Sequence, residues 1–89
     1  MIDIPTTTES EVLSRIIGVD QAGFTPDVAR SLLEFEFPQV DVARMHELAE
    51  KNRSGELTDQ EWEDMQTYMR VGTFLSLLKS KARNSLKRN

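Results

Sequence analysis

The sequence contains no cysteine, a single histidine and no acidic residue after Asp64. Without cysteine the chain can form neither a disulfide nor a thiolate zinc site. No stretch approaches the ~20 apolar residues that cross a bilayer. The acidic start MIDIPTTTESE also lacks the cationic and apolar regions of a secretory signal. We therefore expect a cytoplasmic protein that does not enter a membrane.

The 89 residues are 38% apolar and 29% charged, which is the ordinary range of globular proteins. A chain of this length makes one small domain. Its charges are distributed unevenly. Residues 1–64 carry fifteen acidic and five basic groups, net −10, whereas residues 65–89 carry six basic groups and no acid. We predict a single helical domain over residues 1–89, with residues 70–89 as a basic C-terminal helical arm.

Local signals mark the ends of four helices. Thr8 begins a T-x-x-E capping box, and Gly18 is placed to end the helix that follows. Thr25 before Pro26 opens a second helix, and a third is expected over residues 39–54. The apolar positions expected to face inward on the second and third helices are Val28, Ala29, Leu32, Leu33, Val42, Met45, Leu48 and Ala49.

The fourth helix begins after Thr58 and meets no breaker before the chain ends. Its ~28 residues make a rod of roughly 42 Å. The fold prediction is therefore all-α: a small helical bundle of three shorter helices packed along one long C-terminal helix.

Two apolar stripes run along the long helix. Trp62, Met65 and Met69 form the first, which we expect to be core. The second contains Val71, Leu75, Leu78, Ala82 and Leu86, widened by Phe74 and Leu77. It is either core, covered by the first helix and residues 1–5, or a docking face for another chain.

Length favours docking, because helices of about 10, 10 and 16 residues are too short to cover a 42 Å rod. We therefore expect the C-terminal half of the long helix to extend beyond its neighbours. The predicted partner-binding residues are Arg70, Val71, Gly72, Phe74, Leu75 and Leu78. The partner is another protein or a second copy of this chain.

Residues 50–61, EKNRSGELTDQE, match the positions of an EF-hand calcium loop. Only Glu50 and Glu61 bring charge to its side-chain ligand positions, and Asn52 and Ser54 are neutral. Gly55 as a helix stop, with Thr58 and Glu61 as a second capping box, explains the same pattern. We therefore interpret this stretch as a corner between two helices and predict no metal site.

His46 and Glu50 are one helical turn apart, but two ligands do not complete a metal site. The single histidine also has no context that would activate a serine nucleophile. We predict that the protein is not an enzyme, takes no cofactor and has no small-molecule substrate.

The basic arm carries Lys79, Lys81, Arg83, Lys87 and Arg88. Three interpretations remain open for these cations. They complement the dipole of a helix C-terminus and aid solubility, or they contact an acidic protein surface, or they bind nucleic acid. The arm has few aromatic residues on which bases could stack.

The segments MHELAEKNRSGELTDQE and YMRVGTFLSLLKSKARNSLKRN, together with TPDVARSLL, resemble a family of small uncharacterised bacterial helical proteins from planctomycetes and cyanobacteria. The resemblance covers residues 25–88. Arg70, Val71 and Gly72 match its most recognisable motif. Its end is matched by Lys81, Ala82, Arg83, Ser85, Leu86 and Lys87.

Members of this family lie near nuclease genes, which implies an accessory or antitoxin-like role. The expected function is a non-enzymatic protein-binding module, antitoxin-like or nuclease-accessory, that docks through the C-terminal half of its long helix. The alternative is a nucleic-acid-binding protein that uses the basic arm.

Overall fold

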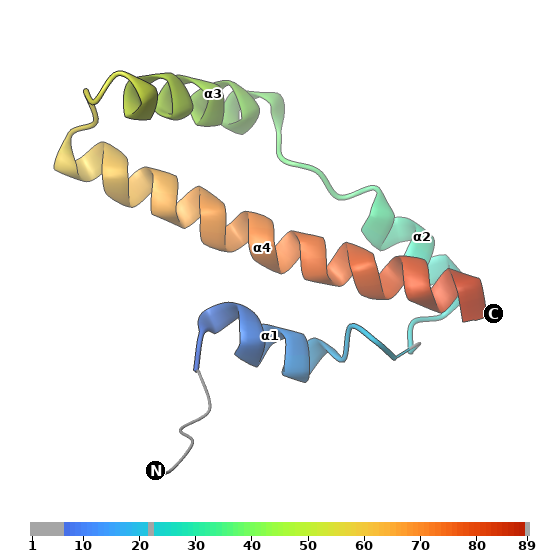
Figure 1. Ribbon diagram of the computed structural model, residues 1–89. Coiled ribbons are helices and arrows are strands. Elements are labelled where there is room, and N and C mark those ends of the chain that lie inside the picture. Colours follow the sequence, from blue (N-terminus) through green and yellow to red (C-terminus); the bar gives the residue numbers. More distant parts are fainter. Residues whose placement is uncertain (1–6, 22, 89) are drawn as a thin grey trace, which may run out of the picture. The chain divides into compact units, whose positions relative to one another are not determined.

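The structure is a computed structural model that describes residues 7–21 and 23–88 (Figure 1). It contains four helices: α1 (Glu9–Ile17), α2 (Pro26–Leu33), α3 (Gln39–Arg53) and α4 (Asp59–Arg88). Across these described ranges there is no strand. The predicted all-α class and the long C-terminal helix are confirmed.

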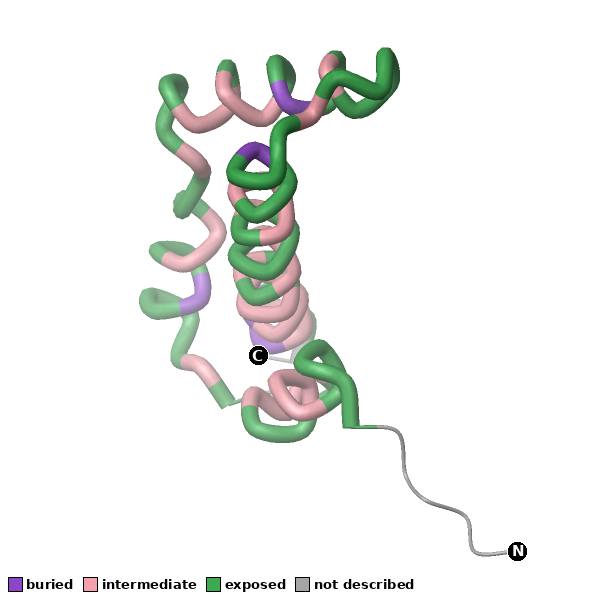
Figure 2. Tube along the Cα trace, turned by 90° about the vertical axis from the view of Figure 1, so that its left-hand side faces the viewer, coloured by how far each residue is buried: buried purple, intermediate pink, exposed green. Residues whose placement is uncertain are grey.

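The chain divides into two compact units, and α4 contributes to both. Unit 1 consists of Met1–Phe35 and Thr73–Asn89, and unit 2 is Glu36–Gly72. In unit 2, α3 lies along the first half of α4 (Figure 1). In unit 1, α1 and α2 lie beside its second half (Figures 1 and 2). Each shorter helix therefore packs along α4, while the single-domain assignment stays a prediction.

The predicted helix ends are confirmed by their capping contacts. The Thr8 hydroxyl accepts the amide of Glu11 at 3.2 Å, and Gly18 ends α1 with a φ of 67°. Thr25 accepts the amide of Val28 at 3.4 Å at the start of α2. A left-handed backbone strains residues that carry a Cβ, so Gly18 suits its position.

The corner between α3 and α4 also forms as predicted. Gly55 has a φ of 72° and follows α3, which ends at Arg53, one residue before the predicted end. The Thr58 hydroxyl accepts the amide of Glu61 at 3.1 Å, and a Glu61 carboxylate oxygen accepts the amide of Thr58 at 3.1 Å. This reciprocal pair is a complete capping box.

The fully buried apolar part of the described chain is small. Ala29, Leu48 and Ala82 are at most 1% exposed (Figure 2). Leu32, Leu33, Val42 and Met45 are half-buried, as their inward positions predicted. Val28, 47% exposed, and Ala49, also exposed, were predicted inward, and those two predictions are wrong.

The first apolar stripe of α4 was predicted as core, and this is wrong for two of its three residues. Met65 is half-buried, but Trp62 is 49% and Met69 58% exposed. Within unit 2, Glu61 and Tyr68 bond to α3 instead, and they lie seven residues apart on one side of α4. Glu61 therefore faces α3. Trp62, the next residue, points about a quarter turn away from it, because successive residues of a helix are 100° apart.

The expectation that the C-terminal half of α4 extends uncovered is also wrong. Ala82 and Ser85 are 0% exposed, and Leu75, Leu78 and Leu86 are half-buried. Helix lengths alone underestimate how much of α4 is covered. In unit 1, the irregular segment after α1 also packs on α4 and bonds to it. Residues 1–5, which the alternative interpretation placed over this stripe, lie outside the described residues.

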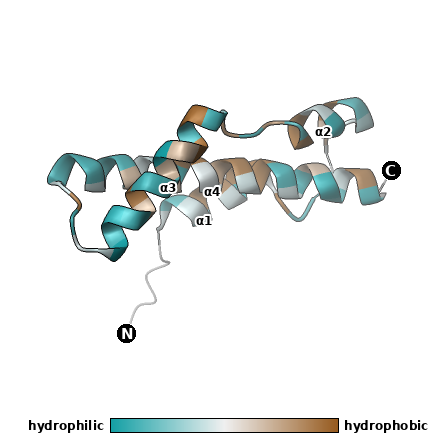
Figure 3. Cartoon of the chain, turned by 90° about the horizontal axis from the view of Figure 1, so that it is seen from above, coloured by the Kyte–Doolittle hydropathy of each residue, from teal (hydrophilic) through white to brown (hydrophobic). Residues whose placement is uncertain are grey.

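Hydropathy changes along α4. Hydrophilic residues dominate its first turns, and hydrophobic residues are concentrated further along the helix (Figure 3). In the described part of the chain, no helix combines the length and apolar character needed to cross a membrane.

Candidate functional site

The predicted partner-binding residues of unit 2 are partly accessible. Arg70 is exposed, and Val71 is 48% exposed. Gly72 is half-buried, and a Cβ built there would lie 3.9 Å from a ring carbon of Phe37. The ring of Phe37 therefore lies close to the backbone at Gly72, leaving Arg70 and Val71 as the accessible members in this unit.

In unit 1, the other three predicted residues differ in exposure. Phe74 is 42% exposed, whereas Leu75 and Leu78 are half-buried. Phe74 is thus the most accessible of the three to a partner.

The sequence analysis assigned Lys81 to the basic arm, and in unit 1 its ammonium group makes tertiary contacts. Nζ donates a 2.6 Å hydrogen bond to the carbonyl of Ile17, at the C-terminal end of α1. The same atom lies 5.2 Å from the centroid of the Phe24 ring, within the range of a cation–π interaction. Lys81 therefore holds α1 and the segment after it against α4.

Two further side chains of α4 hold the same segment. Asn84 donates to the carbonyl of Val19 at 2.7 Å, and the hydroxyl of Ser85 accepts the amides of Gly23 and Phe24 at 3.3 and 3.2 Å. We call Lys81, Asn84 and Ser85 the clamp. Their spacing puts all three on one side of α4. Part of the C-terminal motif thus contributes to the tertiary structure.

The remaining cations of the basic arm differ in accessibility. Arg83 and Lys87 are exposed, and Lys79 is half-buried. A guanidinium nitrogen of Arg83 donates to the Ser80 hydroxyl at 3.3 Å. The side chain of Arg88 lies outside the described part of the chain.

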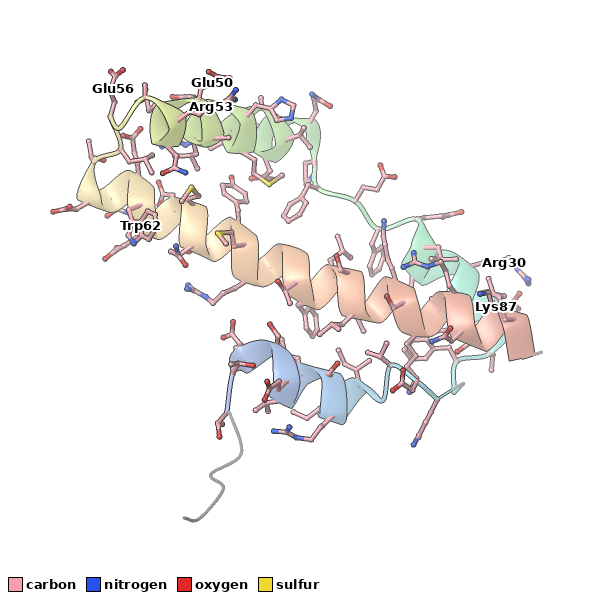
Figure 4. All side chains as sticks on the ribbon, viewed as in Figure 1. Arg30, Glu50, Arg53, Glu56, Trp62 and Lys87 are labelled. Atoms are coloured by element: carbon pink, nitrogen blue, oxygen red, sulfur yellow. The ribbon has the colours of Figure 1, made fainter. Side chains whose placement is uncertain are left out.

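In the corner that resembles a calcium loop, both charged ligand positions are paired with the chain's own cations. Glu50 accepts a 2.6 Å hydrogen bond from Arg53, on the side of α3 away from α4 (Figure 4). Glu61 accepts a 2.6 Å hydrogen bond from Lys51. His46, one turn before Glu50, is exposed. Over the described ranges, no group of three histidine or acidic side chains is placed to hold a metal ion.

The surroundings of Glu61 strongly favour its charged form. Glu61 is 8% exposed, and the guanidinium of Arg44 lies 3.7 Å from one of its oxygens. The hydrogen bond from Lys51, followed by the one from the backbone amide of Thr58, lowers the pKa of Glu61 from 4.5 to about 2. The same bond to Glu61 raises the pKa of Lys51. The capping box and the α3–α4 ion pair therefore share one carboxylate.

A second polar contact joins the two helices of unit 2. The phenol of Tyr68 donates a 2.6 Å hydrogen bond to Asp41, which raises the pKa of Tyr68. The Tyr68 ring also meets Phe37 edge to face, with centroids 6.0 Å apart. Glu61 and Tyr68 thus determine which side of α4 faces α3.

We expect acid to destabilise unit 2 through Glu61. A carboxylate whose pKa is lower in the folded state stabilises fully above its unfolded pKa and loses that contribution as pH falls through the folded value. The loss should therefore occur between about pH 4.5 and about pH 2. Thermal melts over this range should fall less steeply for Glu61→Gln than for wild type.

The matched control for this experiment is Glu63→Gln, an exposed acidic residue two positions away on α4. It should keep the wild-type pH dependence. Equal slopes for wild type and Glu61→Gln would contradict the assignment.

Sequence reasoning missed an exposed surface of unit 2. Trp62 and Met69 are seven residues apart and so lie on one side of α4, separated by two helical turns. Trp62 points away from α3, about 100° around α4 from Glu61 (Figure 4). A surface hollow of about 450 Å³ is lined by Trp62, Glu63, Gln66, Thr67 and Arg70. We call these five residues, together with Met69, the Trp62 face.

The signal that could have identified this face is the alternation of Glu61 and Trp62 at the start of α4. Successive residues of a helix point 100° apart, so a helix that turns Glu61 towards α3 turns Trp62 away from it.

No protein-family model, curated protein or solved structure matches this chain at a significant level.

Proposed function

We propose that this chain is a non-enzymatic, cytoplasmic protein-binding module that docks through α4 and needs no cofactor. The observation that supports this is the exposure of large apolar side chains at predicted partner-binding positions. Val71 in unit 2 is 48% exposed, and Phe74 in unit 1 is 42% exposed. The antitoxin-like or nuclease-accessory character of the module rests on the resemblance of its motifs.

The free energy for such docking comes from burial of these side chains. Fully burying a valine or phenylalanine side chain gains ~1.5–3 kcal/mol. Val71 and Phe74 are each nearly half exposed, and a partner could cover that remaining area. Arg70, also exposed, is of a type enriched at protein interfaces. Leu75 and Leu78 have less area left to bury, so they contribute less to docking.

The alternative, nucleic-acid binding through the basic arm, is supported by fewer residues. The Lys81 ammonium already bonds to Ile17 and faces the Phe24 ring. Arg83 and Lys87 remain exposed for phosphate contact. Since each phosphate neutralised adds to the affinity, losing a cation to the tertiary structure weakens this alternative relative to protein docking.

Site-specific photo-crosslinking should test the docking proposal. We expect a photoreactive phenylalanine analogue at position 74, introduced in the cell of origin, to form a discrete adduct with one protein. The control places the same analogue at Val28, which is 47% exposed but lies on α2. An adduct at position 74 that is absent at position 28 supports the proposal.

A contrary result would be no adduct at position 74, or the same adducts at both positions. In addition, Phe74→Asp in the wild-type background should remove the partner from purified complexes. It should leave the far-ultraviolet circular dichroism unchanged, because the side chain is partly in water.

A further inference from the structure

The Trp62 face has apolar area that its own unit does not cover. Trp62 and Met69 are 49% and 58% exposed, and Gln66 between them is half-buried. Their separation of seven residues corresponds to about 10.5 Å along the helix axis. Neighbouring large apolar groups of this kind in contact with water are typical of interaction surfaces.

Charges at the two ends of this face define what it can accept. Glu63 is exposed next to Trp62, and Arg70 is exposed next to Met69. An occupant must therefore bring positive charge to the Trp62 end and none to the Arg70 end. A cation over an indole ring adds a cation–π attraction to the attraction by the carboxylate.

A segment with this arrangement is present in unit 1 of the same protein. Ser76, Ser80, Arg83 and Lys87 follow one another at intervals of four, three and four residues, so they share one side of α4. Arg83 and Lys87 are exposed (Lys87 is labelled in Figure 4), as is Ser76. On this side of α4, two uncharged hydroxyl residues are thus followed by two cations, while Lys79 is half-buried and points 100° away from Ser80.

The spacing of the two segments matches. Ser80 and Lys87 are seven residues apart, as are Trp62 and Met69. In an antiparallel arrangement, Lys87 lies over Trp62 and next to Glu63 while Ser80 lies over Met69. The hydroxyl groups of Ser76 and Ser80 then meet the end that carries Arg70, where a cation would be repelled.

We propose that the Trp62 face of one copy binds the Ser76–Lys87 segment of α4 from a second copy. The self-association is antiparallel, with Glu63 and Trp62 receiving Lys87 and Arg83. This goes beyond the docking proposed above, because it names the partner and centres on residues other than Val71 and Phe74.

Long-range charge favours the same pairing. Residues 36–72 contain nine acidic and four basic residues, which leaves −5, whereas residues 76–88 contain five basic residues and no acid. Opposite charges of this size speed association at low salt and are screened at high salt. The contact is small, and interfaces below ~1,000 Å² are weak and transient. We therefore expect the two copies to associate only at high protein concentration.

Sedimentation velocity on the full chain tests this proposal, from about 10 μM to about 1 mM at low salt, a range suited to weak interfaces. Wild type should move from monomer towards a larger species, and added salt should reverse the change. Glu63→Lys and Lys87→Glu should each weaken association by about tenfold or more, because like charges then face each other. The double variant should regain most of the wild-type behaviour.

Trp62 is the only tryptophan, so its fluorescence reports on this face directly. Its emission should shift to shorter wavelength as wild type associates, and Lys87→Glu should suppress the shift. The matched control for Glu63→Lys is Glu36→Lys, which makes the same charge change at an exposed position of unit 2 outside the Trp62 face.

Three outcomes would overturn the proposal: a monomer over the whole concentration range, equal weakening by Glu36→Lys, or no recovery in the double variant. None of them depends on the photo-crosslink at position 74, so the two proposals can fail independently.

Discussion

Replacing Leu48 with alanine should destabilise the protein by about 2–5 kcal/mol, the usual cost of removing a buried leucine side chain. Leu48 is 1% exposed and belongs to α3 in unit 2. Among the residues that the structure describes, the other fully buried side chains, those of Ala29, Ala82 and Ser85, are smaller. Urea titration should show a lower midpoint with an unchanged slope.

The control for this experiment is Val40→Ala on the same helix. Val40 is 75% exposed, so its truncation should change the free energy of unfolding by no more than about 0.5 kcal/mol. If Leu48→Ala were as mild as Val40→Ala, α3 would not pack as described.

Replacing Ser85 with alanine should cost about 1–3 kcal/mol, because two hydrogen bonds are lost that each contribute about 0.5–1.5 kcal/mol. The Ser85 hydroxyl is the acceptor for the amides of Gly23 and Phe24, and the residue is 0% exposed. Hydrogen exchange at these two amides should become faster in the variant. This second measurement separates loss of the clamp from a general loss of stability.

Ser76→Ala is the matched control, because Ser76 lies in the same helix but is exposed. Alanine favours helices over serine by a few tenths of a kcal/mol. Ser76→Ala should therefore leave the free energy of unfolding unchanged or raise it slightly. Subtracting its effect from that of Ser85→Ala isolates the contribution of the Ser85 hydroxyl. If Ser85→Ala matched the control and left both amides protected, the hydroxyl would have no role in holding the segment.

The candidate docking positions were only partly predictable from the sequence. Periodicity grouped Val71 and Phe74, which are exposed, with Leu75 and Leu78, which are half-buried, and left open whether this stripe is core or a docking face. It also placed Trp62 in the core, because it counted only apolar residues. Glu61 and Tyr68 face α3 because they bond to Lys51 and Asp41. These partners are 10 and 27 residues away in the sequence.

The basic arm shows the same limit. Charge counting treats Lys81 and Lys87 as equivalent, yet Lys81 bonds to the end of α1 and Lys87 is exposed. The Ile17 carbonyl, which accepts the hydrogen bond from Lys81, is 64 residues away in the sequence. No local pattern identifies such an acceptor.

The sequence by itself determined where the helices begin and end. Thr8, Thr25 and Thr58 cap their helices, and Gly18 and Gly55 end theirs, through contacts that span only a few residues. Such contacts are encoded locally. Only the tertiary structure decided which side of α4 is buried and which cations remain exposed. Those outcomes depend on hydrogen bonds from Lys51 to Glu61 and from Lys81 to Ile17, whose partners meet only when the helices pack together.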